Sequence, residues 1–362
     1  QMLFMKNNGF EVLTISSEGK EVSDIKKREK CRHIVVPFSR KISPFKDLYC
    51  LFSLIKIFYN EKPTIIHSHT PKAGLLSMLA SKILGIKLRI HTVAGMPLMT
   101  KKGFQKKLLL ITEKITYWSA NFILPNSLSL YSFIKEKKLI NPIKLNIIGN
   151  GSSNGIDINR FNENNLNKKR IYNIKKKINY NKENYYLLAI GRLVKDKGII
   201  ELVNVFIKLN KNNKRLKLLL LGPFESVRKD ETLPLEIKNQ IKNNPNITQI
   251  DWVDDVEYYL NFSNLFIHCS HREGFPNVVL QSGLMNCPVL CSDIPGNIDI
   301  ISNKKNGLCF EVNNETDLEK KILYIINNKK NINKYVKKLR IEIIKNYSRG
   351  VFHQNLLNFY NK

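Results

Sequence analysis

An acidic side chain and a tight turn follow one of the apolar stretches of the chain. Glu273 comes shortly after the apolar run Leu265–Cys269, and Gly274, Phe275 and Pro276 follow it. This order predicts a strand, a turn and the start of a helix, whose first N–H groups have no partner within the helix and can bind phosphate or sugar oxygens. Because a carboxylate accepts hydrogen bonds, Glu273 can bind sugar hydroxyls beside them. The segment therefore predicts a site for a sugar and a phosphate. The alternative is a buried strand, turn and helix without a ligand.

A longer stretch around Glu273 resembles a known family pattern. Residues 273–281 read Glu-Gly-Phe-Pro-Asn-Val-Val-Leu-Gln, which resembles the E-x7-E region of retaining glycosyltransferases of family 4 with the GT-B fold. In that family the first acid holds the donor sugar, and the second usually binds the ribose hydroxyls of the nucleotide. Here Gln281 stands in place of the second acid, so it can donate and accept hydrogen bonds but brings no charge. The resemblance implies that nucleotide binding persists with altered strength.

A second motif places two cations directly after an apolar stretch. Residues 191–198, Gly-Arg-Leu-Val-Lys-Asp-Lys-Gly, resemble the G-R-L-x-x-x-K-G motif of the same family. The resemblance implies that Arg192 and Lys197 lie over the donor diphosphate, where the leaving group gains negative charge as the glycosidic bond breaks. Arginine can bind two phosphate oxygens at once, whereas lysine supplies a movable point charge. The alternative is a solvated helix start with incidental cations.

The resemblance also implies which residues form the whole donor site. Glu273, Arg192 and Lys197 would carry the catalysis, and no dedicated protein nucleophile is evident. The other expected donor-binding residues lie at strand ends or after Glu273, and they are Gly191, Gly222, Val253, Gly274, Phe275, Pro276, Asn277, Val278 and Gln281. Val253 is assigned from a Trp-Val-Asp-Asp-Val segment that lacks the glycine usual in the family. Nothing in these motifs requires a metal or another cofactor.

Two motifs in the first half of the chain resemble the acceptor side of the same family. Residues 65–74, Ile-Ile-His-Ser-His-Thr-Pro-Lys-Ala-Gly, resemble a segment of members that build bacterial surface polysaccharides. The resemblance implies that His69 and Lys72 contact the phosphate or the hydroxyls of an acceptor, with Gly95 in the next loop. A hydrogen-bonded structural histidine is the alternative for His67 and His69. A metal site with His67 and His69 as ligands is a further alternative, but the sequence indicates no third ligand.

Strands and helices alternate along the chain, which predicts parallel sheets covered by helices on both faces. The expected strands are 11–15, 34–37, 64–67, 87–92, 122–125, 144–148, 185–191, 216–222, 247–250, 265–269, 289–292 and 307–310. The expected helices are 45–59, 72–84, 103–119, 127–137, 197–208, 235–243, 256–262, 316–327 and most of the stretch that ends at residue 360. The polar run 162–183 predicts the linker between two domains and the lead-in to the second domain. Ligands of such sheets bind beyond the carboxyl ends of the strands.

Together with the resemblance, this pattern implies the α/β GT-B architecture, with two doubly wound Rossmann-like domains that face a cleft. We expect an N-terminal acceptor-binding domain over residues 1–165 and a C-terminal nucleotide-sugar-binding domain over residues 166–345. A final helix over residues 346–362 is expected to pack back toward the N-terminal domain.

Two features depart from the family pattern. The sequence begins at Gln1, inside what resembles the first helix, so we expect that about 20 residues are missing, the length of a strand and its loop. A missing central strand would leave the ladder groups of its neighbours unpaired and expose core surface. Ala94 stands where many relatives carry a histidine near the donor sugar, so that contact is lost or is supplied by another group.

Composition narrows the class of protein further. A length of 362 residues suits two domains, and no apolar run of about 18 residues or signal peptide is visible. Six scattered cysteines indicate reduced thiols in the cytoplasm. The formal net charge of +29 favours a negatively charged partner, or it reflects a coding bias toward Lys, Asn and Ile. No nucleic-acid-binding motif is apparent. The basic stretch 101–110 predicts peripheral contact with an anionic membrane, with an ordinary surface helix as the alternative.

The sequence thus favours a glycosyltransferase that moves a sugar with retention from a nucleotide sugar, in particular a UDP-sugar. The acceptor would be a polyprenyl-diphosphate-linked glycan for a bacterial surface polysaccharide, and the enzyme would act in the cytoplasm at the inner face of the cell membrane. One alternative is a GT-B nucleotide-sugar epimerase, which needs an acid and base set that these motifs do not supply. The other is a truncated, inactive remnant that only binds nucleotide or membrane.

Overall fold

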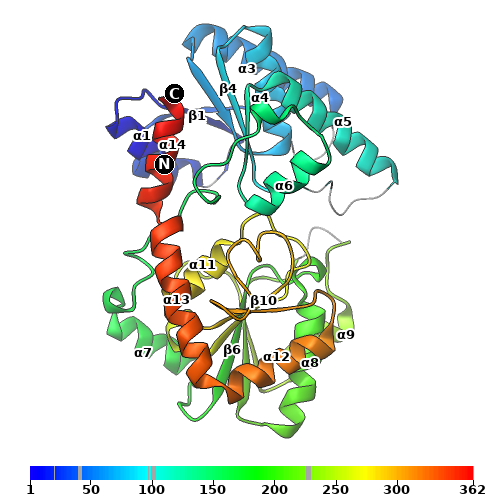
Figure 1. Cartoon of the computed structure of the whole chain (residues 1–362), viewed down its shortest axis with the longest axis vertical. Coiled ribbons are helices and arrows are strands. Elements are labelled where there is room, and N and C mark those ends of the chain that lie inside the picture. The colour runs from blue at the N-terminus through cyan, green and yellow to red at the C-terminus, as the bar shows by residue number, and fades with distance from the viewer. Residues whose placement is uncertain (20, 40–42, 97, 99–102, 226–229, 362) are drawn as a thin grey trace. The chain divides into compact units, whose positions relative to one another are not determined.

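The chain folds into two compact units (Figure 1). The computed structural model describes residues 1–361 apart from 20, 40–42, 97, 99–102 and 226–229. The first unit comprises Gln1–Asn154 together with Gly350–Lys362, and the second comprises Gly155–Arg349. No helix in the described ranges combines the length and the apolar composition that crossing a membrane requires.

The first unit contains two separate parallel sheets. One sheet pairs β1 (Leu13–Ser16) with β2 (Arg32–Val35), and in the other β4 (Leu88–Val93) lies between β3 (Ile65–Ser68) and β5 (Phe122–Pro125). The helices of this unit are α1 (Met2–Asn7), α2 (Glu21–Glu29), α3 (Pro44–Glu61), α4 (Pro71–Ile83), α5 (Gly103–Ser119), α6 (Leu128–Glu136) and α14 (Arg349–Tyr360). Helix α4 packs between α3 and α5 and covers β3 and β4.

The last helix, α14, belongs to the core of the first unit. Phe352 and Leu356 of α14 are buried in one cluster with Met5 of α1 and Ile90 of β4. Figure 1 shows α1 and α14 side by side, so the two ends of the described chain meet on this unit. The apolar spacing of Phe352 and Leu356, four residues apart, supplies the buried stripe that holds the helix there.

The second unit is built on one six-stranded parallel sheet in the order β11-β10-β9-β6-β7-β8. Its strands are β6 (Tyr185–Ile190), β7 (Leu216–Leu221), β8 (Ile247–Ile250), β9 (Leu265–His268), β10 (Val289–Ser292) and β11 (Leu308–Phe310). Its helices are α7 (Lys168–Lys177), α8 (Ile199–Asn212), α9 (Leu235–Asn243), α10 (Val256–Phe262), α11 (Asn277–Leu284), α12 (Glu315–Asn327) and α13 (Lys329–Tyr347). Because side chains alternate along a strand, Leu187 of β6 enters a core with α8, α9 and α12, while Leu188 enters a core with α7, α10 and α11.

The structure divides the chain earlier than residue 165, where we expected the boundary. Ile156 and Phe161 are buried in the core of the second unit. The backbone of Ile156 also donates to the Tyr347 carbonyl oxygen at 2.8 Å and accepts from the Arg349 N–H at 2.8 Å. Residues 155–165 therefore belong to the second unit because their apolar side chains and their backbone bonds are satisfied there.

Three local features differ from what the sequence predicted. The stretch 144–148 is not a strand, because it pairs with β5 only at the single bridge between Ile123 and Leu145. The polar run 162–183 is not only a linker, since it contains α7. The Asn167 side chain caps α7 by accepting from the Arg170 N–H at 3.1 Å, which is the usual helix-start signal. Helix α2, which is mostly charged, was also not expected.

A cavity of about 740 Å³ separates the two sheets of the first unit. Its walls include Leu13 and Ile15 of β1 and Ile65 and His67 of β3. Among the described residues, β1 is hydrogen-bonded to β2 alone and β3 to β4 alone, so no described strand joins them.

Candidate functional site

The two strongest motifs meet at the edge of the second sheet. Lys197 follows β6 and Glu273 follows β9, and these two strands are neighbours in the middle of the sheet. The strand order reverses between them, since β7 and β8 extend to one side and β10 and β11 to the other. Such a switch point leaves an open crevice beyond the carboxyl ends of the strands, where ligands bind. There the Lys197 Nζ pairs with Glu273 Oε1, although 76 positions separate them in the sequence.

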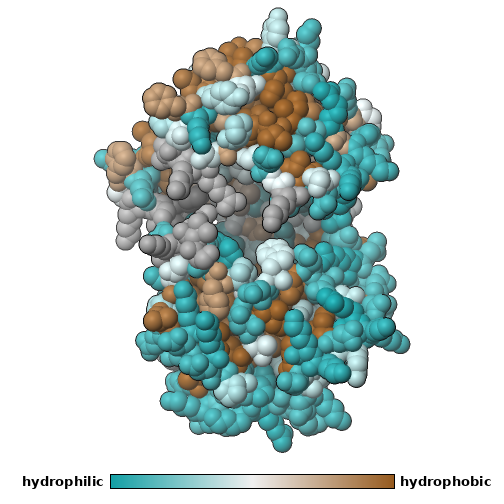
Figure 2. Space-filling view, turned by 180° about the vertical axis from the view of Figure 1, so that it is seen from behind, coloured by the Kyte–Doolittle hydropathy of each residue, from teal (hydrophilic) through white to brown (hydrophobic). Residues whose placement is uncertain are grey.

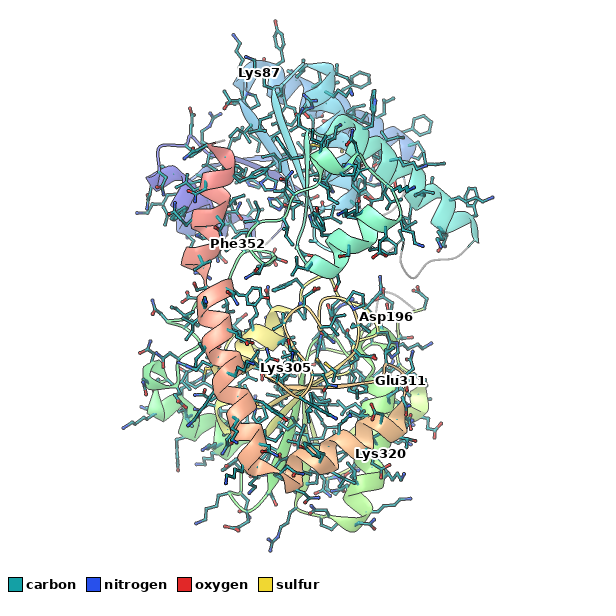
Figure 3. All side chains as sticks on the ribbon, in the orientation of Figure 1. Lys87, Asp196, Lys305, Glu311, Lys320 and Phe352 are labelled. Atoms are coloured by element: carbon teal, nitrogen blue, oxygen red, sulfur yellow. The ribbon has the colours of Figure 1, made fainter. Side chains whose placement is uncertain are left out.

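A glycine allows the loop after β6 to approach the loop after β9. Gly198 adopts a left-handed φ of 64°, and a Cβ at this position would lie 2.1 Å from the carbonyl oxygen of Cys269. Next to this contact, the His271 N–H donates to the Asp196 carbonyl oxygen at 2.9 Å. The Arg272 Nε also donates to the Asp196 carboxylate at 2.7 Å. Asp196 lies in the loop that follows β6 (Figure 3), so the two loops are joined through backbone and side chain.

Glu273 is held as a charged, mostly buried carboxylate. Its Oε1 accepts from Ser270 Oγ at 2.7 Å and lies 3.1 Å from His268 Nε2, in addition to the Lys197 pair. Burial alone would raise the pKa of this carboxyl, but His268 and Lys197 together hold its pKa well below the usual range. Glu273 is therefore ionised across the physiological range and can act only as an acceptor of hydrogen bonds.

The turn after Glu273 opens α11 without a side-chain cap. Pro276 occupies the N-cap position and carries no acceptor, so its side chain makes no capping bond to the first turn. The exposed Asn277 begins the helix, and Val278 is partly buried. The backbone N–H groups of this turn can bind an anion, as the sequence suggested. By contrast, the side chain of Phe275 is buried against Tyr347 at a ring distance of 5.3 Å, so Phe275 can contribute to a ligand site only through its backbone.

Gln281 lies in the second turn of α11 and is partly buried. Gly274 is held close to the loop after β10, because a Cβ on Gly296 would lie 2.8 Å from the Gly274 carbonyl oxygen. Gly296 itself adopts a left-handed φ of 88°. The loops after β6, β9 and β10 therefore converge around Glu273.

Arg192 lines a small cavity together with Gly191, Lys197 and His268. Its guanidinium Nη1 pairs with Glu225 at 2.6 Å and with Glu231 at 2.9 Å. A diphosphate that binds Arg192 must therefore compete with two carboxylates. The sequence motif predicted the cation, but it did not predict these partners.

Glycine also allows the strand ends next to Arg192 to approach each other closely. A Cβ on Gly222 would lie 2.0 Å from the Gly191 carbonyl oxygen, so only glycine permits the loops after β6 and β7 to touch. The Gly222 carbonyl oxygen accepts from the Gln249 side chain at 2.9 Å, which ties the end of β8 to the same edge. Val253 follows β8 and is partly buried. Gly191, Gly222 and Val253 thus follow three adjacent strands of the sheet.

The expected acceptor residues lie in the first unit, at the carboxyl end of β3. His67 uses both ring nitrogens within the fold, with Tyr360 at Nδ1 and Thr92 Oγ1 at 2.7 Å from Nε2. His67 is therefore a structural residue. His69 stacks on the His67 ring at 4.3 Å and is exposed, so it remains a candidate for acceptor contact. Within the described ranges, no three His, Cys, Asp or Glu side chains form a group that could hold a metal ion.

Lys72 and Gly95 differ in how available they are to a ligand. The Lys72 Nζ pairs with the Asp47 carboxylate of α3 at 2.8 Å, so it links α4 to α3. An acceptor phosphate would have to share this ammonium with Asp47. Gly95 lies in the loop after β4 with a positive φ of 159° and is only partly buried.

The glycine that ends the 65–74 motif makes room for a buried histidine. A Cβ on Gly74 would lie 2.3 Å from Cε1 of His91, so the imidazole fills the space that a side chain would take. His91 accepts or donates a hydrogen bond with Ser68 Oγ at 2.8 Å. Burial, with a smaller contribution from His69, lowers the pKa of His91 to about 3.

This buried imidazole predicts acid sensitivity of the first unit. An unfolded chain binds a proton on the imidazole below about pH 6.5, whereas the folded chain does so only near pH 3. The stabilising contribution is therefore complete above pH 6.5 and is lost as pH falls toward 3, by about 1.4 kcal/mol per pH unit. Urea unfolding of the wild type and of His91→Gln at pH 7, 6 and 5 tests this. The variant should be less stable at pH 7 and lose less stability on acidification, and equal pH slopes would contradict the assignment.

Sequence reasoning missed four groups that shape the site. His268 and Ser270 contact Glu273, Asp196 joins the two loops, and Gly296 approaches the Glu273 turn. The spacing of Ser270, three residues before Glu273, is the one local signal that could have indicated a hydrogen bond. The contacts of Asp196 and Gly296 depend on which strands become neighbours, and that of His268 depends on how the loop after β9 turns back.

Two family models match the chain. The family described as "Glycosyl transferases group 1" matches residues 170–342, and the family described as "Glycosyl transferase 4-like" matches residues 1–127. The capsular polysaccharide biosynthesis glycosyltransferase CapM of Staphylococcus aureus is 34% identical over 330 residues, which cover 90% of this chain and 83% of CapM. The chain belongs to glycosyltransferase family 4. This confirms the resemblance that the Glu273 and Arg192 motifs suggested, and the protein is a transferase enzyme.

Further similarities agree with the architecture of this glycosyltransferase. The UDP-Gal:alpha-D-GlcNAc-diphosphoundecaprenol alpha-1,3-galactosyltransferase of Escherichia coli is 25% identical over 321 residues, covering 85% of this chain and 78% of its own. The solved structure of Anabaena HepE in complex with UDP-glucose has a TM-score of 0.82 at 15% identity, and the match covers 99% of this chain and 94% of that one. The expected GT-B fold is thereby confirmed.

Proposed function

We propose that this glycosyltransferase moves a sugar, with retention of its anomeric configuration, from a UDP-sugar to a polyprenyl-diphosphate-linked glycan. The product would enter a bacterial surface polysaccharide. The observation that carries the proposal is the Lys197–Glu273 pair at the switch point, next to the uncapped start of α11. A cation, a carboxylate and helix N–H groups at one sheet edge are the groups that bind a diphosphate and the sugar attached to it.

The names of the relatives support the two substrate classes. The Escherichia coli relative is named for a UDP-Gal donor and a diphosphoundecaprenol-linked acceptor, and CapM is named for capsular polysaccharide biosynthesis. HepE was solved with UDP-glucose. With a lipid-linked acceptor, we further propose that the enzyme acts in the cytoplasm at the inner face of the cell membrane, in peripheral contact with the bilayer.

In the proposed mechanism, Arg192 and Lys197 stabilise the diphosphate as it leaves with the bonding electrons. Glu273 accepts hydrogen bonds from hydroxyls of the donor sugar, together with the backbone of residues 274–278 at the start of α11. Gln281 contacts the ribose through its amide. The acceptor hydroxyl forms the new bond on the face from which the diphosphate departs, and its proton passes to the leaving phosphate. Gly191, Gly222 and Val253 shape the nucleotide pocket, while His69, Gly95 and Lys72 lie on the acceptor side.

A transfer assay with Arg192→Ala tests this assignment. Purified enzyme is incubated with UDP-glucose, UDP-galactose or their N-acetylhexosamine counterparts and an undecaprenyl-diphosphate-linked sugar, and UDP release is measured. The variant should lose about a hundredfold in kcat/KM, because one donor to the transition-state charge is removed. Arg192→Lys should recover only part of the activity, since lysine cannot bind two oxygens at once.

Arg215→Ala is the matched control, because Arg215 is an exposed arginine at the opposite end of the sheet, before β7. Its activity should equal that of the wild type. Undiminished UDP release by Arg192→Ala would overturn the proposed role. An inverted product anomer, read by NMR coupling constants, would overturn retention while leaving the transferase intact. Conversion of the UDP-sugar to its epimer without an acceptor would favour the epimerase.

A further inference from the structure

Helix α3 has apolar side chains on two opposite faces. Its inner face buries Cys50, Leu54 and Phe58, spaced four residues apart, against α4. Its outer face carries large side chains that are exposed to solvent, namely Phe45, Leu48, Tyr49, Phe52 and Tyr59. Phe45 is 89% exposed and Phe52 is 61% exposed. The outer face of α3 thus carries a row of exposed apolar side chains in place of the polar face that is usual for a surface helix.

Helix α5 repeats this arrangement on the other side of α4. Its outer face exposes Phe104, Ile111, Ile115 and Trp118, with Phe104 80% exposed and Trp118 61% exposed. The spacing of these residues, seven, four and three, keeps them on one side of the helix. Because α3 and α5 both pack against α4, the two rows belong to one helical layer of the first unit. Figure 2 shows a broad area of apolar side chains on the first unit.

The charged residues beside these rows are of one sign. Lys46 and Lys56 are exposed on α3, and Lys106, Lys107 and Lys114 are exposed on α5. The acidic side chains of the same helices either form ion pairs or are buried. Asp47 pairs with Lys72, Glu61 pairs with Arg32, and Glu113 is buried. The outer surface of both helices therefore combines exposed aromatic side chains with uncompensated cations. Lys101 and Lys102, which began the basic stretch noted in the sequence, lie outside the described residues.

We propose that the exposed apolar rows on α3 and α5 each bind anionic phospholipid bilayers. Helices that lie in a bilayer interface combine Phe, Trp and Leu on their apolar face with Lys on the flanks, where lysine stems reach the headgroups. Anionic lipid attracts such cations within a Debye length of the membrane. A second copy of the chain or an acidic protein fits less well, because the cores of protein interfaces are depleted in lysine. On these two helices lysines alternate with the apolar residues.

The inference extends the proposed function, but its test needs no sugar transfer. The full chain is sedimented with large unilamellar vesicles of phosphatidylcholine containing 30% phosphatidylglycerol, and with vesicles of phosphatidylcholine alone. Binding should be at least tenfold stronger to the anionic vesicles and should weaken in 0.5 M NaCl. Phe45→Ser combined with Phe52→Ser, and Phe104→Ser combined with Trp118→Ser, should each weaken binding at least tenfold.

Two exposed apolar residues of the second unit provide the control. Leu235 on α9 is 72% exposed and Ile341 on α13 is 65% exposed, so Leu235→Ser combined with Ile341→Ser removes a similar amount of exposed apolar surface. This control should bind vesicles as the wild type does. All variants change exposed side chains, and thermal unfolding confirms that each is folded.

Three results would overturn the inference. The first is wild-type binding that does not distinguish anionic from neutral vesicles. The second is vesicle binding that both helix variants leave unchanged. The third is a concentration-dependent dimer in analytical ultracentrifugation that the same substitutions abolish while vesicle binding persists, which would assign the surface to self-association. Each result is independent of whether the enzyme transfers sugar.

Discussion

Replacing Glu273 with glutamine should lower kcat/KM for sugar transfer by about two to three orders of magnitude, the range seen when one preorganised electrostatic contact is lost. The substitution keeps the shape of the side chain but removes the charge that pairs with Lys197. Lys197 would then lack its counter-ion, and the sugar hydroxyls would lose a charged acceptor, which is stronger than a neutral one. Initial rates of UDP release over a range of UDP-sugar concentrations measure the effect.

Glu257→Gln is the matched control for this prediction. Glu257 is also a buried carboxylate of the second unit, and it pairs with Arg160 at 2.9 Å, but it lies on α10. Its loss should reduce stability and leave kcat/KM within about threefold, since it contacts no expected substrate group. If Glu273→Gln kept more than half of the wild-type rate, Glu273 would be a structural partner of Lys197 and the donor site would lie elsewhere.

Gly198→Ala should destabilise the second unit by about 3 kcal/mol or more, which combines left-handed backbone strain with the cost of overpacking. The new Cβ would lie 2.1 Å from the carbonyl oxygen of Cys269, so the loop after β6 must move away from β9. That movement would also separate Lys197 from Glu273, and transfer activity should fall together with stability. Differential scanning calorimetry measures the first effect, and UDP release measures the second.

Gly85→Ala distinguishes the cost of backbone strain from the cost of steric overlap with the new Cβ. Gly85 has a φ of 67°, close to the 64° of Gly198, but no atom lies within 4 Å of the position that its Cβ would take. Its substitution should therefore cost only the backbone strain, about 1 kcal/mol. If both variants lost the same stability, the close approach between the loop after β6 and the end of β9 would not be important for folding.

Local sequence signals were sufficient for most of the second unit. An apolar run predicted β10 with its observed ends, because buried parallel strands need continuous apolar sequence. The segment Ile-Thr-Gln-Ile predicted β8 with its observed ends, although its two central residues are polar. The ends of α9 and α10 were also predicted, since each lies between turn-forming residues. The motifs around Arg192 and Glu273 identified the residues at the switch point. Their pairing follows from the strand order, which a family resemblance implies but local spacing does not.

The rest depends on contacts between distant segments. Nothing near Arg192 in the sequence indicates that Glu225 and Glu231 bind it. The exposed row on α3 was missed because a helix with apolar residues on both sides has no clear polar face to predict. His268 is part of an apolar stretch, and only the fold brings its ring to Glu273. The specific site residues therefore remain proposals that the mutations above can test.

The cavity between β1 and β3 has a consequence for the local stability of the first unit. No residue of β1 or β2 is buried, whereas β4 contains the buried Ile90 and His91. Regions with few buried apolar contacts open at lower free energy than the packed core of the same domain. The layer of β1 and β2 should therefore unfold as a separate, weaker cooperative unit, and the wall of the cavity that contains His67 and His69 would become accessible without global unfolding. The acceptor side of this enzyme would then be the part of the fold with the greatest freedom to adapt its shape.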